Sequence, residues 1–196
     1  MIPQPQVAAK PYIRNLPNFL TTLRLLSIPF LVMLFYLPIP YQFELVGAIF
    51  LLASATDLID GYIARRREQI TDLGKLLDPV ADKLLVIAAL VLLVEADRLW
   101  AWLAILIVGR EIAVTALRAI ASSSGRVMQA EGMGKLKMTF QVVGITMLFV
   151  FDPAAQPWAW QAGTAALGVA AVLALVSAGR YARQVGQLLG LIKSDR

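Results

Sequence analysis

The sequence contains neither histidine nor cysteine. Without histidine, the chain cannot form a serine–histidine catalytic pair, a phosphohistidine, or a histidine-ligated zinc or haem site. Without cysteine, disulfides, iron–sulfur clusters and thiolate chemistry are excluded. Charged residues are also scarce, at 16% of the 196 positions. Any catalysis by this chain must therefore use carboxylates, lysines, arginines and hydroxyl groups.

Hydrophobic residues make up 59% of the chain, and its mean hydropathy is +0.70. A soluble domain of this length cannot bury so much apolar surface, which indicates a polytopic membrane protein. Six apolar runs lie near residues 18–37, 44–65, 79–94, 99–117, 134–151 and 157–179. Each approaches the ~20 helical residues that cross a bilayer, and polar residues should extend the short third and fifth runs. We therefore predict an all-α integral membrane protein with six transmembrane helices, forming one domain over residues 1–196.

Basic residues alternate between the predicted connections. Lysines and arginines are frequent in the N-terminal segment 1–15, around 65–75, around 118–137 and in the C-terminal tail. The segments "PIPYQ" and "DPAAQPW" contain none, and "EADR" contains only Arg98. Because basic loops stay on the inner side of a membrane, both termini should be cytoplasmic, including segment 1–15. The net charge of +5 then reflects topology and contact with anionic lipid, and we expect no nucleic-acid partner.

Four aspartates lie at the cytoplasmic ends of the second and third predicted spans. Asp57 and Asp60 are three residues apart, and Asp78 and Asp82 are four apart, so each pair shares one helix face. An intramembrane carboxylate costs about 2.5–3.5 kcal/mol, which makes capping or interfacial solvation a weak explanation for all four. Four oxygen donors on adjacent helices suit a hard divalent cation. The pattern predicts a Mg²⁺ or Mn²⁺ site that can hold a diphosphate.

The aspartates belong to a longer pattern, Asp57-x-x-Asp60-Gly61-x-x-Ala64-Arg65, eight further residues, then Gly74-x-x-x-Asp78-x-x-x-Asp82. This pattern resembles the signature of the CDP-alcohol phosphotransferase family. The resemblance implies transfer of a substituted phosphoryl group from a CDP-alcohol to an acceptor hydroxyl, with release of CMP. It implies that Asp57, Asp60 and Asp78 are metal ligands, and that Asp82 is both a ligand and the catalytic general base. The residues implied to contact cytidine diphosphate are Asp57, Gly61, Ala64, Arg65 and Gly74.

Further segments, "NLPNFLTTLRLLSIPFLVMLFYLP", "LDPVADKLLV", "GREIAVTALRAIASSSG" and "GKLKMTFQ", resemble the family's bacterial phosphatidylglycerophosphate synthases. That resemblance implies CDP-diacylglycerol as donor, glycerol 3-phosphate as acceptor and a homodimer. It also implies a bacterial cytoplasmic membrane, with the active site facing the cytoplasm.

A phosphomonoester acceptor needs a basic pocket beside the metal. Candidates at the cytoplasmic ends of the fourth and fifth spans are Arg110, Arg118, Lys135 and Lys137. A topological role is the alternative for the two lysines, and a structural pair with Glu111 is the alternative for Arg110. Thr21, Thr22 and Arg24 are candidates for lining the pocket.

Other functions stay open at this point. Cardiolipin synthases that use phosphatidylglycerol, and phosphatidylinositol-phosphate synthases, share the aspartate signature, so it does not select the acceptor. An ion transporter can also keep carboxylates in its spans. Transport, however, requires polar groups through both leaflets, and outer halves such as "VIAALVLLV" and "GITMLFVF" offer almost none. The sequence therefore favours a site that opens to one side of the membrane.

Overall fold

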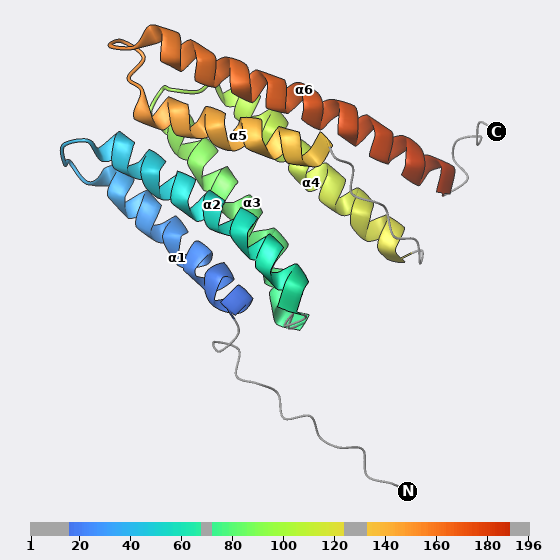
Figure 1. The fold of residues 1–196 in the computed structure, drawn as a ribbon. Helices are drawn as coiled ribbons and strands as arrows, with labels where there is room; N and C mark the ends of the chain where they lie inside the picture. The colour runs from blue at the N-terminus through green and yellow to red at the C-terminus, as the bar shows by residue number, and fades with distance from the viewer. Residues whose placement is uncertain (1–15, 68–71, 124–132, 189–196) are drawn as a thin grey trace, which may run out of the picture.

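The computed structural model describes the backbone of residues 16–67, 72–123 and 133–188, and side chains within 22–56, 80–121 (except 82) and 136–187. Six helices and no strand occupy these ranges (Figure 1). They are α1 (Leu16–Tyr36), α2 (Gln42–Arg67), α3 (Asp72–Glu95), α4 (Ala101–Ser123), α5 (Met133–Val150) and α6 (Pro157–Leu188). A helix covers each predicted apolar run, and polar residues extend α3, so the all-helical prediction is confirmed.

Length and apolar character bear on membrane crossing for the part of each helix whose side chains the structure describes. Among the described residues, 157–187 of α6 form the helix that is both long and apolar enough to span a bilayer alone. The described parts of α1, α2 and α5 are shorter apolar stretches, residues 22–36, 42–56 and 136–150. The prediction of six crossings and their orientation thus stays a prediction.

The helices form a closed ring of neighbours, in the order α3, α1, α2, α5, α6 and α4. The connections α1–α2, α3–α4 and α5–α6 gather at one end of the bundle, which we call the hairpin end (Figure 1). The last turns of α2, α4 and α6 lie at the opposite end, which we call the basic end. Helix α1 packs along both α2 and α3, whereas α2 and α3 contact each other only briefly. The two aspartate-bearing helices are therefore held mainly through α1.

Apolar side chains fill the centre of the bundle and also cover its outside. The interior contains fully buried Leu31, Phe50, Leu90, Phe149 and Leu167. Large apolar side chains are exposed on every helix whose side chains are described at length, including Phe30, Leu52, Val91, Ile105, Val143 and Val172. A water-soluble protein rarely exposes so much contiguous apolar surface. The exterior is what a hydrocarbon environment requires.

Helices α5 and α6 approach most closely at a pair of glycines. A Cβ atom built on Gly144 would lie 2.9 Å from the carbonyl oxygen of Gly163 and 2.8 Å from Cγ of Leu167. A Cβ on Gly163 would lie 3.0 Å from Cβ of Met147. Small residues allow such backbone contact, and close packing stabilises helix pairs in membranes.

We expect Gly144→Ala to separate α5 from α6 and to reduce stability by about 1–3 kcal/mol, the usual cost of overpacking. The measurement is thermal unfolding of the purified protein in detergent. Gly168→Ala is the matched control, because nothing lies within 4 Å of a Cβ built there. Equal midpoints for the two variants would contradict the proposed tight contact.

A Schellman motif ends α3 and positions Arg98. Asp97 adopts a left-handed conformation with φ of 54°. Its N–H donates to the carbonyl of Val94 at 3.1 Å, and the N–H of Arg98 donates to the carbonyl of Leu93 at 2.9 Å. The chain then turns inward, and Arg98 is 7% exposed.

Arg98 links neighbouring helices at the hairpin end. Its Nη1 donates to the carbonyls of Leu148 (3.2 Å) and Phe149 (2.7 Å), and Nη2 pairs with Asp152 at 3.3 Å. Its guanidinium carbon lies 3.9 Å from the ring centroid of Phe43 on α2. The indole N–H of Trp160 on α6 donates to the Arg98 carbonyl at 3.1 Å. One residue thus caps α5 and contacts α2 and α6.

The Asp152 carboxylate makes this contact pH-dependent. Its pKa lies below the ordinary value because it accepts the N–H groups of Ala155 and Ala154 and faces Arg98. Burial lowers the pKa of Arg98 more than Asp152 raises it, but an arginine stays protonated throughout. A lowered carboxyl pKa adds stability above the unfolded pKa of about 3.9, and this stability is lost as pH falls through the folded value.

We therefore expect Asp152→Asn to lower the thermal midpoint at pH 7, with the difference from the unmodified protein shrinking below about pH 4. Thermal unfolding in detergent across pH measures it. Asp97→Asn is the control, because it removes an exposed carboxylate from the neighbouring turn while keeping a residue type that tolerates φ > 0. A difference that persists unchanged at low pH would show that charge is not the cause.

Candidate active site

The predicted metal-binding aspartates lie on the two helices that meet at the basic end. Asp57 and Asp60 belong to the last turns of α2, and Asp78 and Asp82 to the first half of α3. The helical backbone keeps each pair on one face. The side chains of these four residues lie outside the described residues, as do those of the signature positions Gly61, Ala64, Arg65 and Gly74.

The chemistry of this donor set fits a hard divalent cation. Four carboxylates offer oxygen ligands only, which Mg²⁺ and Mn²⁺ prefer, and no histidine or cysteine is present to favour a softer metal. Among the side chains that the structure describes, no group of three or more metal-ligating residues occurs elsewhere. The aspartates of α2 and α3 are accordingly the metal-site candidates.

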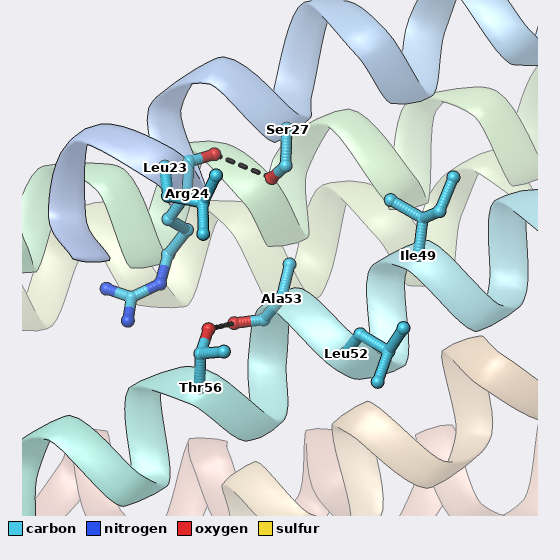
Figure 2. A pocket seen from close by; sticks show the side chains of 7 residues that line it. All are labelled: Leu23, Arg24, Ser27, Ile49, Leu52, Ala53 and Thr56. Atoms are coloured by element: carbon cyan, nitrogen blue, oxygen red, sulfur yellow. Dashed lines mark hydrogen bonds between the residues drawn. The ribbon is translucent and has the colours of Figure 1, made fainter. Parts of the chain in front are cut away.

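The pocket-lining candidates of α1 separate into different environments. Thr22 is exposed, Arg24 is only 3% exposed, and Thr21 lies outside the described side chains. Figure 2 shows the Arg24 guanidinium beside Thr56, on the side toward which α2 continues to Asp57. The structure thus places one of the three candidates, Arg24, as a buried cation next to the aspartate-bearing segment of α2.

Two of the predicted acceptor-binding cations meet at a shared carboxylate. Arg110 Nη1 donates to Oε1 of Glu111 at 3.0 Å, and the ammonium of Lys137 on α5 bonds to the same oxygen. Arg110 Nε donates to the carbonyl of Ala174 at 2.9 Å, and Nη2 bonds to the hydroxyl of Ser177. Arg110 and Lys137 are both buried. This cluster joins α4, α5 and α6, and it carries two positive charges against one negative charge.

The other two acceptor candidates lie further toward the basic end. Arg118 stands two turns beyond Arg110 on α4, where Nη2 donates to the Tyr181 hydroxyl at 3.0 Å and the guanidinium carbon lies 4.9 Å from the ring centroid. The side chain of Lys135 lies outside the described residues. The structure therefore brings Arg110 and Lys137 together and places Arg118 along the same α4–α6 seam.

Sequence reasoning missed the α6 residues that complete this seam. Ser177 and Tyr181 are buried and four residues apart, so they share a face of α6 opposite Arg110 and Arg118. Ser177 could have been noticed as a polar residue within an apolar stretch, whereas Tyr181 stands beside Arg180 and Arg183 and is not singled out by the sequence. What the sequence did not provide was the pairing of α4 with α6.

The fold and site define a class: a helical bundle with an apolar exterior, carboxylates on two helices, and buried cations toward the same end. A sequence profile of the CDP-alcohol phosphatidyltransferase family matches residues 14–187. The chain belongs to this family, whose members are membrane-associated enzymes that generally depend on a divalent metal. The family resemblance of the aspartate pattern is thereby confirmed.

Three relatives carry the name CDP-diacylglycerol–glycerol-3-phosphate 3-phosphatidyltransferase. The Pseudomonas fluorescens protein is 43% identical over 174 residues, covering 86% of this chain and 89% of the relative. The Bacillus subtilis protein is 38% identical over 180 residues, covering 85% and 93%. The Escherichia coli K12 protein is 40% identical over 172 residues, covering 85% and 92%. The similarity extends well beyond the aspartate signature in each case.

Proposed function

We propose that this protein transfers the phosphatidyl group of CDP-diacylglycerol to the hydroxyl of glycerol 3-phosphate. The products are CMP and phosphatidylglycerophosphate, so the reaction belongs to phospholipid biosynthesis. The observation that carries the proposal is identity of 38–43% to phosphatidyltransferases of this printed activity, over nearly the full length of both chains. Cardiolipin synthases and phosphatidylinositol-phosphate synthases remain alternatives only at the level of the shared signature.

The carboxylates supply the chemistry at the donor. Asp57, Asp60, Asp78 and Asp82 hold Mg²⁺ or Mn²⁺, which when bound neutralises charge on the diphosphate. Asp82 takes the proton of the acceptor hydroxyl as its oxygen bonds to the lipid-linked phosphorus. The bond from that phosphorus to the bridging oxygen breaks, and CMP leaves with the electron pair. In this proposal, the residues that contact cytidine diphosphate are Asp57, Gly61, Ala64, Arg65 and Gly74.

Arg110, Glu111 and Lys137, which we call the basic cluster, supply positive charge to bind the acceptor's phosphate. A phosphomonoester carries close to two negative charges, and Arg110 with Lys137 exceeds Glu111 by one positive charge. Arg118 and Lys135 belong to the same basic end. Charge-assisted bonds from such residues select an acceptor that carries a phosphate over a neutral polyol.

The proposed orientation in the membrane follows from the hairpin end and the basic end of the bundle. We place six spans across a bacterial cytoplasmic membrane, with segment 1–15, both termini and the active site at the cytoplasmic face, and we infer a homodimer. The apolar exterior and the gathering of the hairpin turns at one end support this orientation. The hairpin turn before α4 contributes Arg98, which is turned inward against α5 and so does not contradict a basic inner face.

The direct test is an assay of the purified protein with CDP-diacylglycerol, Mg²⁺ and a radiolabelled acceptor. We expect labelled phosphatidylglycerophosphate from glycerol 3-phosphate, and no product from inositol phosphate, serine or phosphatidylglycerol. Consumption of phosphatidylglycerol with glycerol 3-phosphate ignored would replace the proposal with the cardiolipin synthase alternative. Conversion of none of these acceptors would overturn it.

The aspartates should be indispensable. Asp57→Asn or Asp78→Asn should abolish turnover and weaken Mn²⁺ binding, because each removes a charged metal ligand. Asp82→Asn should lose turnover but keep donor binding, since it removes the proton acceptor. Glu95→Gln, an exposed carboxylate at the far end of α3, is the control and should change neither. Full activity in excess chelator would contradict the assignment of a metal site. Loss of donor binding in Asp82→Asn would mean that Asp82 acts mainly as a metal ligand.

Neutralising Arg110 should affect the acceptor more than the donor. A charge-assisted hydrogen bond is worth about 1.5–3 kcal/mol, so Arg110→Gln should lower kcat/KM for glycerol 3-phosphate about tenfold to a hundredfold. Because Arg110 also joins α4 to α6, the thermal midpoint must be measured in parallel. Ser177→Ala is the matched control, since it removes one Arg110 contact but no charge. If Ser177→Ala reproduced the kinetic loss, the role of Arg110 would be structural.

A further inference from the structure

A pocket of about 180 Å³ opens between α1 and α2 (Figure 2). Its lining residues are Leu23, Arg24, Ser27, Ile49, Leu52, Ala53 and Thr56. The two hydroxyls among them are already bonded to their own helices, Ser27 to the carbonyl of Arg24 and Thr56 to that of Ala53, both at 2.7 Å. Apart from Arg24, the walls therefore offer hydrocarbon to an occupant.

The pocket has one charged end and one open side. Arg24 lies at its charged end, where Figure 2 shows the guanidinium extending past Thr56, the residue directly before Asp57. Leu23 and Leu52 line the pocket and are 47% and 67% exposed, so the pocket communicates with the surface of the bundle. The surface around it is apolar on both helices, which in a membrane is the lipid-facing side.

The walls and volume identify the kind of occupant. Water in a pocket needs two to four polar partners, which hydrocarbon walls do not supply. A dry apolar cavity of roughly 150 Å³ holds a benzene-sized molecule, so this pocket holds a short segment of hydrocarbon and not a whole acyl chain. The cation at one end favours a molecule whose apolar segment is followed by an anionic group.

We propose that this pocket receives the first methylene groups of one acyl chain of the nucleotide-lipid donor, while Arg24 binds its diphosphate. The inference rests on the proposed function and adds a place for the lipid part of the donor. The chain segment lies against Ile49, Leu52 and Ala53, and its remainder leaves between α1 and α2 into the bilayer. The diphosphate then lies where α2 continues to Asp57, at the metal-site candidates.

Filling the pocket tests the lipid half of the inference. Ala53→Leu adds volume inside the pocket, and Ala48→Leu makes the same change at an exposed position of the same helix. We expect Ala53→Leu to raise KM for CDP-diacylglycerol tenfold or more, with KM for glycerol 3-phosphate unchanged, and Ala48→Leu to change neither. If Ala53→Leu does not yield folded protein, Ala53→Val provides the smaller obstruction. An unchanged donor KM in a folded, active Ala53 variant overturns the proposal.

CDP-glycerol, which carries the cytidine diphosphate but no acyl chains, distinguishes an effect on the pocket from an effect on the nucleotide site. Inhibition by CDP-glycerol should be equal in the unmodified protein and in Ala53→Leu, because this inhibitor lacks the segment that the pocket holds. A parallel loss of CDP-glycerol inhibition would mean that the substitution distorts the aspartate end, and would overturn the assignment.

Arg24 is tested with the same two ligands. Arg24→Gln should weaken both CDP-diacylglycerol and CDP-glycerol about tenfold or more, since both carry the diphosphate, and Arg24→Lys should restore part of that loss. Unchanged inhibition by CDP-glycerol in Arg24→Gln would overturn the role of Arg24. The proposed function fails separately, and visibly, if the unmodified protein makes no product from CDP-diacylglycerol.

Discussion

The buried guanidinium of Arg98 is the contact on which the arrangement of the helices most depends. It caps the carbonyls at the end of α5, pairs with Asp152 and covers the Phe43 ring, while its own carbonyl accepts the indole N–H of Trp160. A buried cation is stable only when its donors are satisfied, so these partners must occupy their places together. The three hairpins are thereby fixed relative to one another at the end opposite the aspartates. The polar groups of Arg98 and Asp152 at the hairpin end thus stabilise the fold, whereas the proposed catalytic carboxylates lie at the opposite end.

At the basic end, the spacing of the site depends on α1. Helices α2 and α3 carry the aspartates but meet each other only briefly, and α1 packs along both. A change in the position of α1 would therefore alter the separation of Asp57 from Asp78 without touching either. The buried Arg24 lies on this same helix, and the pocket that it lines lies between α1 and α2. In the proposed reaction, a lipid chain between α1 and α2 would rest against the helix that holds α2 and α3 apart, so donor binding would be coupled to the geometry of the candidate metal site.

Most of the helical architecture could be predicted from the sequence because apolar runs, proline breakers and aspartate spacing are local properties. The six helices cover the six predicted runs, and the fixed period of a helix places Asp57 with Asp60 and Asp78 with Asp82. The partners of Arg98, and the α6 partners of Arg110, could not be predicted in this way. They lie 50 or more residues away along the chain, and their contacts exist only once α5 and α6 have packed. The orientation of the helices in the membrane likewise depends on the bilayer, and the sequence bears on it only through the positive-inside rule.

The cluster of Arg110, Glu111 and Lys137, proposed to bind the acceptor's phosphate, keeps buried cations inside an apolar bundle. Two buried cations alone would each carry a desolvation penalty of several kcal/mol, and one shared carboxylate offsets part of that cost. Complete neutralisation, however, would remove the attraction for an anionic acceptor. With one glutamate between two cations, the cluster keeps a single net positive charge. In the proposed reaction, the acceptor's phosphate therefore meets cations that Glu111 already holds in position, so the ordering cost of two long side chains is met by the fold and not by the substrate.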